Sequence, residues 1–182
     1  MTPQFPEYFA LFGIPQRFAI DPGQLTRAYR EVLSQVHPDR FAGAGPAERR
    51  AAMQMSSHAN EAFEVLRSDS ARAAYLCRQQ GQIVDGAGAV PLPLDFLERQ
   101  MQWHELLDQA REQQDDAAIA ELARDVEQNR LATIARIAHS IDGAADYRAG
   151  AAEVRALMFL DKLGGDIARA ATERNDALAS GK

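Results

Sequence analysis

The sequence predicts an all-α protein with two helical domains, and three observations carry this prediction. Alanine and leucine dominate the composition, which favours helices over strands. Apolar residues recur at three- and four-residue spacing along several segments, the period of a helix with one buried face. Residues 81–93 (GQIVDGAGAVPLP) gather glycine and proline, so no helix continues through them. We therefore expect an N-terminal domain over residues 1–80, a linker over 81–93 and a C-terminal domain over 94–182.

The N-terminal domain is predicted to contain four helices, of which the first is short and covers residues 7–12. Asp21 can cap the second helix, which ends before Pro38 because a residue that precedes proline is driven out of the α-helical region. Pro46 suits the first turn of the third helix, and the fourth ends near Gln80. Apolar stripes on the second and third helices predict that these two pack as an antiparallel hairpin. The stripe residues are Leu25, Tyr29, Val32, Leu33, Val36, Ala52, Met55, Ala59, Ala62, Phe63 and Leu66.

The C-terminal domain is predicted to be a bundle of three helices. The expected ranges are 94–114, 116–141 and 144–178. Asp115 or Asp116 can place a negative charge at the start of the second of these helices, where the helix dipole favours it. Asp142 and Gly143 mark the turn before the third.

Charge and cysteine content narrow the possible functions. The net charge is −6 at pH 7, and it is concentrated in residues 81–182 rather than in 1–80. Nucleic-acid-binding proteins are normally basic, so we expect no nucleic-acid partner. We also expect no membrane partner and no signal peptide, because no apolar run approaches the ~20 residues of a membrane span. Cys77 is the only cysteine, which excludes an internal disulfide and Cys-rich metal sites and favours a cytosolic location.

The tripeptide His37-Pro38-Asp39 lies between the second and third predicted helices. Proline fixes its own φ angle, so the histidine and the aspartate are expected to project from a rigid loop. Asp39 offers a carboxylate to an arginine of a partner, and Arg30 and Arg40 add positive charge that attracts an acidic surface. Taken alone, the tripeptide is more often only a helix-stopping turn, with the arginines on a solvated face. A catalytic His–Asp dyad is disfavoured, because no nucleophile is suitably spaced.

The residues around this tripeptide resemble those of a J-domain, the module through which co-chaperones engage heat-shock-type ATPase chaperones. Tyr29 and Arg30 precede the tripeptide, and Arg40 and Phe41 follow it. The strings NEAFEVL (60–66) and RAAY (72–75) complete a resemblance that covers roughly residues 5–80. It implies that the protein docks on an ATP-bound chaperone and stimulates its ATP hydrolysis, and that it is not itself an enzyme. The residues that the resemblance assigns to chaperone binding are Tyr29, Arg30, His37, Pro38, Asp39 and Arg40.

Over nearly its whole length the chain resembles the HscB family, the J-type co-chaperones of bacterial iron–sulfur cluster assembly. The matching strings are YFALFGIP (8–15), HPDRF (37–41), FLERQM (96–101), ELLD (105–108) and FLDKL (159–163). Arg40 stands where a lysine is commoner, which keeps the charge. The resemblance implies an HscA-type ATPase chaperone as the partner of the N-terminal domain, an IscU-type scaffold protein as the partner of the C-terminal domain, and no cofactor. The paired cysteines that animal relatives carry ahead of the J-domain are absent, which favours a bacterial, cytoplasmic protein.

The first C-terminal helix carries two apolar sectors when its residues are placed at about 100° intervals. The sector expected to face the core holds Phe96, Trp103, Leu106, Leu107 and Ala110. The other sector lies roughly 120–140° away and holds Leu94, Leu97, Met101 and His104. If this helix packs against both other helices, both sectors are buried in the core. If it packs on one side only, the second sector is exposed, and an exposed apolar stripe is typical of a partner surface.

The HscB resemblance favours the exposed interpretation. It implies that Leu97, Met101 and Phe159 bind the scaffold protein. Phe159 lies roughly 60° off the buried stripe of the third helix, so it is expected at the edge of the core, within reach of the same surface. Glu98 and Glu105 either form a polar rim around that surface or are simply a solvated helix face.

Two other functions stay open at this level. In the first alternative, the protein is a J-protein with a different client. In the second, it is a helical enzyme or a metal protein that uses its histidines. The four histidines are His37, His58, His104 and His139. They are far apart in the sequence and show none of the spacings of metal-binding motifs, so we predict no metal site.

Overall fold

The computed structural model describes residues 5–36, 38–41, 43 and 45–180, and within these residues it contains helices and turns but no strand. The prediction of an all-α fold is therefore confirmed. The contacts divide the chain into two compact units, Met1–Leu76 and Cys77–Lys182. In the described part of the chain, no helix is both long enough and apolar enough to span a bilayer.

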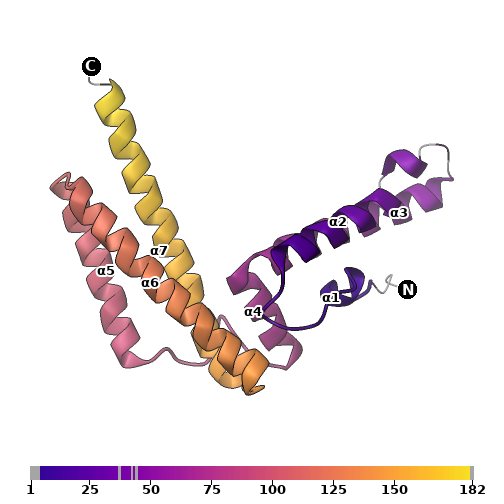
Figure 1. Ribbon diagram of the computed structural model, residues 1–182, viewed down its shortest axis with the longest axis horizontal. Coiled ribbons are helices and arrows are strands. Elements are labelled where there is room, and N and C mark those ends of the chain that lie inside the picture. The colour runs from indigo at the N-terminus through magenta and orange to yellow at the C-terminus, as the bar shows by residue number, and fades with distance from the viewer. Residues whose placement is uncertain (1–4, 37, 42, 44, 181–182) are drawn as a thin grey trace. The chain divides into compact units, whose positions relative to one another are not determined.

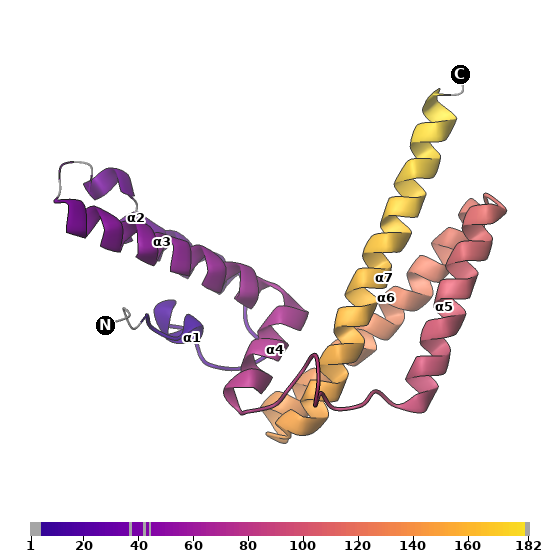
Figure 2. The ribbon, with the colours of Figure 1, turned by 180° about the vertical axis from the view of Figure 1, so that it is seen from behind.

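The N-terminal unit is built around two long helices that form the predicted antiparallel hairpin (Figures 1 and 2). The hairpin helices are α2 (Pro22–Val36) and α3 (Pro46–Arg67). The short helix α1 (Tyr8–Leu11) packs against α3. A 3₁₀ turn, η1 (Pro38–Phe41), follows α2, and α4 (Asp69–Gln79) follows α3.

Polar groups and a glycine mark three helix ends, of which the cap at Asp21 is predicted from the sequence. The Asp21 carboxylate accepts a hydrogen bond of 2.8 Å from the backbone N–H of Gly23 in the first turn of α2. At the start of α4, the Ser68 hydroxyl accepts the backbone N–H of Ala71 at 3.3 Å. These bonds satisfy first-turn donors that have no partner within the helix. Gly81, just after α4, has a φ of +74°, which glycine adopts without steric cost.

The predicted stripes of α2 and α3 do face each other. Leu25 on α2 is 2% exposed and Leu66 on α3 is fully buried. Between them, the ring of Tyr29 stacks on the ring of Phe63 with the centroids 4.1 Å apart. The buried alanines of α3 are Ala52, Ala59 and Ala62, and their small side chains let the two helices approach closely.

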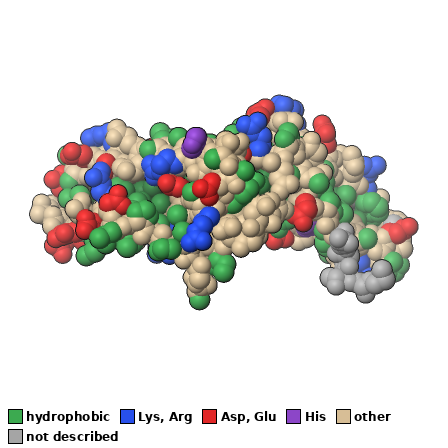
Figure 3. Space-filling model, turned by 90° about the horizontal axis from the view of Figure 1, so that it is seen from below, with side chains coloured by type: hydrophobic (Ala, Val, Ile, Leu, Met, Phe, Trp, Pro, Cys, Tyr) green, Lys and Arg blue, Asp and Glu red, His purple; other side chains and the backbone are tan. Residues whose placement is uncertain are grey.

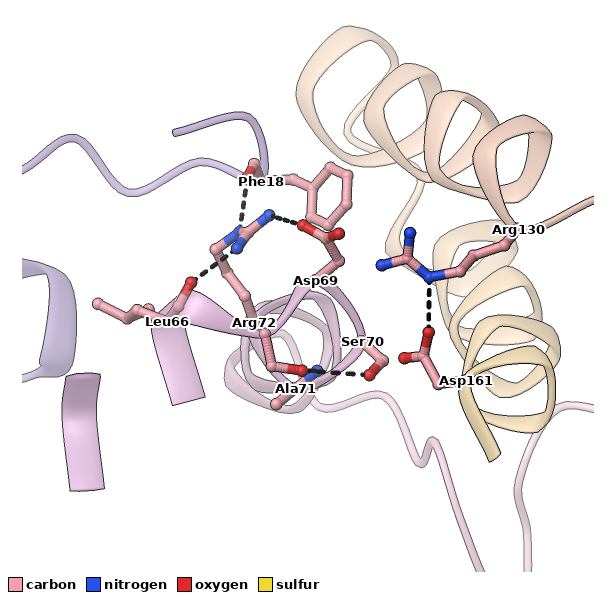
Figure 4. Close-up of polar contacts among 9 residues, drawn as sticks. Phe18, Leu66, Asp69, Ser70, Ala71, Arg72, Arg130 and Asp161 are labelled. Atoms are coloured by element: carbon pink, nitrogen blue, oxygen red, sulfur yellow. Dashed lines mark hydrogen bonds and ion pairs between the residues drawn. The ribbon is translucent and has the colours of Figure 1, made fainter. Parts of the chain in front are cut away.

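A buried arginine ties three segments of the N-terminal unit together (Figure 4). Arg72 on α4 is 6% exposed. Its Nε donates to the carbonyl oxygen of Phe18 at 2.7 Å and its Nη1 to that of Leu66 at 2.6 Å. Its Nη2 pairs with the Asp69 carboxylate at 2.6 Å. The guanidinium also lies 4.9 Å from the centroid of the Phe18 ring, so its charge is both hydrogen-bonded and placed over an aromatic face.

The C-terminal unit is the predicted bundle of three helices (Figures 1 and 2). Its helices are α5 (Leu94–Glu112), α6 (Asp116–Ala138) and α7 (Tyr147–Ser180). The Asp115 carboxylate caps α6 by accepting the backbone N–H groups of Ala117 and Ala118, each at 3.0 Å. The turn predicted at Asp142 and Gly143 is the end of a π-helical segment, His139–Gly143, which leads from α6 into α7.

The core of the bundle lies among all three helices. Its fully packed members include Trp103 and Leu107 of α5, Val126 of α6 and Leu160 of α7. One core prediction is wrong, because Leu106 is 52% exposed. Leu106 lies roughly 100° around α5 from Leu107, and α5 contacts its neighbours over a sector too narrow to cover both positions. Leu106 lies instead at the rim of a groove between α5 and α6.

The segment that precedes α5 packs with the C-terminal unit. The buried thiol of Cys77 donates to the carbonyl oxygen of Tyr147 at 3.6 Å. Val84 is 1% exposed, and the Arg155 guanidinium donates a short hydrogen bond to the carbonyl oxygen of Val90. Within the stretch that we predict to be a linker, the carbonyl group of Val90 thus attaches the chain to α7.

Candidate functional site

The residues predicted to bind a chaperone lie between the middle of α2 and the turn that follows this helix. Tyr29 and Arg30 are on α2, and Arg40 is in the η1 turn that follows it. His37 and the side chains of Pro38 and Asp39 lie outside the described residues. The backbone from Pro38 to Phe41 forms a 3₁₀ turn, so the predicted stop of α2 before Pro38 is confirmed.

Tyr29 makes its contacts within the hairpin. Besides stacking on Phe63, its ring meets the edge of Phe12 at a centroid distance of 6.3 Å. Its hydroxyl donates to Oδ1 of Asn60 on α3 at 2.9 Å. These contacts make Tyr29 part of the packing that holds α2 against α3. Its predicted role in chaperone binding stays a prediction.

The two arginines predicted to bind a chaperone, Arg30 and Arg40, are exposed. Arg40 donates from Nη1 to the carbonyl oxygen of Ser34 at 2.7 Å. That carbonyl belongs to the last turn of α2, where carbonyl groups lack helical partners. The bond holds the Arg40 side chain against the end of α2 while its charge stays accessible. Arg30, in the middle of α2, is exposed as well.

The second predicted surface lies on α5. Leu94 is 72% exposed, Leu97 is 40% exposed and Met101 is 73% exposed. The second apolar sector of α5 is therefore at the surface, as the exposed interpretation expects. Figure 3 shows one face of the C-terminal unit, in its left part, where hydrophobic side chains lie among acidic and basic ones.

Phe159 of α7 connects this sector to the core. It is partly buried and packs against the core cluster. Its ring stacks nearly parallel to the Trp103 indole, at an interplanar angle of 18° and a centroid distance of 6.2 Å. It also meets the Phe96 ring edge-on at 5.8 Å. Phe159 thus lies at the edge of the core, where we expected it. We call Leu97, Met101 and Phe159 together the apolar surface.

Acidic residues lie beside the apolar surface. Glu98 and Glu105 of α5 are both exposed, which fits a polar rim as well as a solvated face. Sequence reasoning left one neighbour of this surface without a role. The imidazole of His104 meets the Phe159 ring edge-on, with the centroids 5.5 Å apart. The three-residue spacing between Met101 and His104 indicates that both side chains lie on one face of α5. The spacing does not show which ring of another helix His104 contacts.

The other candidate chemistry of the sequence lies elsewhere. Burial raises the pKa of the Cys77 thiol to about 11, so at neutral pH the thiol is protonated and a poor nucleophile or metal ligand. His58 is partly buried, and its Nε2 donates to the carbonyl oxygen of Pro6 at 2.8 Å. Among the described residues, no three His, Cys, Asp or Glu side chains are grouped so that they hold a metal ion.

Comparison with known proteins decides the family. Residues 92–168 match the family model described as the HSCB C-terminal oligomerisation domain. The chain is 44% identical to the co-chaperone protein HscB homolog of Bordetella pertussis, over 90% of this chain and 95% of that protein. The chain belongs to the HscB family of co-chaperones. The HscB homolog of Bordetella petrii is 46% identical over the same shares of the two chains.

Two solved HscB structures share the fold. The chaperone HscB from Vibrio cholerae superimposes with a TM-score of 0.82 at 28% sequence identity, covering 93% of this chain and 99% of that one. The human co-chaperone protein HscB superimposes with a TM-score of 0.83, covering 89% of this chain and 80% of that one. At 20% identity the human structure supports the fold alone. All three residues of the apolar surface lie within the stretch that matches the HscB C-terminal domain.

Proposed function

We propose that this protein is a J-domain co-chaperone of iron–sulfur cluster assembly in the bacterial cytoplasm. Residues 1–80 act as the J-domain, which stimulates the ATPase of an HscA-type chaperone. Residues 94–182 bind an IscU-type scaffold protein and deliver it to that chaperone. Membership of the HscB family supports the co-chaperone role. The observation that carries the delivery role is the exposure of Leu97 and Met101, at 40% and 73%, beside the half-buried Phe159.

The apolar surface has the properties of a protein-binding site. Its two α5 side chains, Leu97 and Met101, are flexible and accessible, while the Phe159 ring stacks on the buried Trp103 indole. A partner that covers them removes apolar area from water, and methionine adapts its shape to the surface that it meets. Phenylalanine and methionine are both enriched in protein–protein interfaces relative to the rest of a protein surface. Glu98 and Glu105 then lie at the rim, where exposed charges affect specificity and encounter more than affinity.

Two exposed arginines support the chaperone-binding role by their charge. Arg40, in the same turn as Asp39, and Arg30, in the middle of α2, are both exposed and present guanidinium groups to solvent. Guanidinium groups form strong, geometrically specific bonds with carboxylates, so an acidic docking surface on the chaperone is favoured. Attraction between opposite charges also raises the rate of encounter. We propose that His37, Pro38 and Asp39 complete this site, with Tyr29 keeping α2 and α3 in register beneath it.

Joining the two sites in one chain has a thermodynamic consequence. A scaffold protein held by the C-terminal unit meets the chaperone as an intramolecular partner once the N-terminal unit has docked. The effective concentration of such tethered partners reaches the millimolar range for short connections. Delivery is therefore favoured even when the chaperone binds free scaffold protein weakly.

The test combines ATP turnover with direct binding, using the full chain, the cognate HscA-type chaperone and the IscU-type scaffold protein. The chain should raise the ATPase rate, and scaffold protein should raise it further. His37→Gln should abolish stimulation and leave scaffold affinity unchanged. The double variant Leu97→Ala/Met101→Ala should weaken scaffold binding by about 30-fold, or about 2 kcal/mol. Leu106→Ala is the matched control, because Leu106 is also an exposed leucine of α5, at 52%, but on another face.

Each result separates the proposal from its alternatives. If ATPase stimulation depends on His37 but scaffold protein does not bind, the protein is a J-protein with a different client. If Leu106→Ala weakens scaffold binding as much as the double variant does, the apolar surface is not the binding site. ATP turnover that persists without any chaperone, and that His37→Gln abolishes, would indicate an enzyme and contradict the proposal.

A further inference from the structure

His104 lies where the proposed scaffold-binding surface changes from aliphatic to aromatic. It is exposed on α5, three residues after Met101 and seven after Leu97, so the three side chains share one side of the helix. Its imidazole is also the α5 ring that meets Phe159 from the exposed side, at 5.5 Å and an interplanar angle of 75°. A partner that covers Met101 and Phe159 therefore also covers His104.

We propose that His104 is a further specificity-determining residue of this surface and that it binds the scaffold protein as a neutral ring. This inference rests on the proposed function, because it assumes that the apolar surface is where the scaffold protein binds. Its consequence is that protonation of His104 weakens the complex. The N-terminal unit and its chaperone contact are not involved.

The physical reason is the cost of burying a charge among apolar groups. A neutral imidazole meets the Phe159 ring as an aromatic group and adds apolar contact area. An imidazolium ion carries a full charge that water solvates well, and a partner covering it removes that water. The neighbours that would surround the buried ion, Leu97, Met101 and Phe159, carry no group that accepts a hydrogen bond strongly. The covered state therefore disfavours the charged ring more than the free state does.

Charged side chains flank His104 and Phe159 in the sequence. On α5, Glu105 is adjacent to His104 and Asp108 lies one turn later on the same side. On α7, Arg155 and Lys162 lie about one turn to either side of Phe159. These are two carboxylates and two cations, so their formal charges cancel.

The test is the pH profile of scaffold affinity, measured with the full chain by calorimetry between pH 8 and pH 5.5. The unaltered protein should lose about tenfold in affinity over this range, because a histidine side chain ordinarily changes its charge there. His104→Phe keeps an aromatic ring that cannot be protonated. It should bind with the full affinity at pH 8 and lose less than about twofold by pH 5.5. His104→Gln, which is polar but uncharged, should bind more weakly at pH 8 and show the same flat profile.

The control is His139→Phe, because His139 is exposed on the turn between α6 and α7. It should retain the pH profile of the unaltered protein. Titrating groups of the scaffold protein contribute equally to every profile, so the difference between variants isolates His104. The inference is overturned if His104→Phe loses as much affinity at low pH as the unaltered protein does. If Leu97→Ala/Met101→Ala binds at pH 8 as tightly as the unaltered protein, the proposed function has failed instead, since that result does not depend on any histidine.

Discussion

Trp103 and Asp125 are joined by a hydrogen bond across the C-terminal bundle, in which the indole Nε1 of α5 donates to the carboxylate of α6 at 2.7 Å. The same carboxylate accepts from Nη2 of Arg99 at 3.2 Å and from Nδ2 of Asn129 at 3.1 Å. The Arg99 guanidinium lies 5.5 Å from the centroid of the indole ring. One carboxylate thus fixes the orientation of the large ring against which Phe159 stacks.

Removing this carboxylate should destabilise the C-terminal unit. Asp125→Ala leaves the indole N–H of a residue that is 1% exposed without its acceptor, and an unsatisfied buried donor costs about 1–3 kcal/mol. Urea unfolding followed by fluorescence of Trp103, the only tryptophan, measures the loss. Asp108→Ala removes an exposed carboxylate of α5 and should change stability by less than about 0.5 kcal/mol. Equal effects of the two substitutions would contradict a specific role for the Trp103–Asp125 bond.

The three residues of the apolar surface should differ in what they contribute to stability. Phe159 packs on Trp103 and Phe96, so Phe159→Ala opens a gap at the edge of the core. Full burial would cost about 3–5 kcal/mol. Because the ring is only partly buried, we expect about 2 kcal/mol together with loss of scaffold binding. Leu97→Ala and Met101→Ala should weaken binding at little cost to stability. A thermal melt of each variant checks this, and an unchanged melting temperature for Phe159→Ala would show that the ring is not part of the core.

The sequence predicts helices well here because the signals for their ends are local. Asp21, Ser68 and Asp115 each accept N–H groups two or three residues ahead. Gly81 takes the positive φ that follows a helix. Such contacts involve neighbours in the chain, so residue type and spacing suffice to predict them. The same holds for the buried face of α3, whose small and apolar residues recur at helical spacing.

Neighbours from other parts of the chain were not predictable in this way. Helical periodicity gives the angle at which Leu106 lies on α5, but not how wide a sector of α5 the other two helices cover. The prediction that Leu106 is buried is wrong for this reason. The ring that His104 meets belongs to α7, 55 residues further along the chain. Val84 is buried although its segment shows no periodicity at all. The roles of His37, Pro38 and Asp39 rest on family resemblance, because the tripeptide alone is also a simple turn.

Arg72 should be among the residues on which the N-terminal unit depends most. Arg72→Met keeps much of the side-chain volume but removes the donors to the Phe18 and Leu66 carbonyl groups. It also leaves Asp69 without this cation. Because Arg72 is 6% exposed, the loss of its buried bonds should cost about 3 kcal/mol. Arg67→Met is the control, because the Arg67–Glu64 ion pair is 59% and 61% exposed and such pairs contribute at most about 1 kcal/mol. Amide hydrogen exchange in α2 and α3 reports the change without relying on tryptophan.

Two tyrosines of the N-terminal unit should ionise late in an alkaline titration. Burial, aided by a hydrogen bond with Glu61, raises the pKa of Tyr8 to about 12. Burial, aided by a hydrogen bond to Glu7, likewise raises the pKa of Tyr75 to about 12. The two rings stack with their centroids 4.5 Å apart, and the Tyr8 N–H donates to the Tyr75 hydroxyl at 3.2 Å. In the folded chain, the phenol groups of Tyr8 and Tyr75 are thus held in the protonated form.

The sign of the resulting pH dependence follows from proton binding. An unfolded tyrosine loses its proton near pH 10, whereas Tyr8 and Tyr75 keep theirs until about pH 12 in the folded chain. Between these values the folded state binds more protons, so the free energy of unfolding falls as the pH rises. The contribution of the two phenols is complete below pH 10 and is lost as the pH approaches 12. Phenolate absorbance should show the late ionisation of Tyr8 and Tyr75 in the unaltered protein, and one late group fewer in Tyr8→Phe. Ionisation of Tyr8 and Tyr75 near pH 10 in a chain that is still folded would refute the packing of this pair.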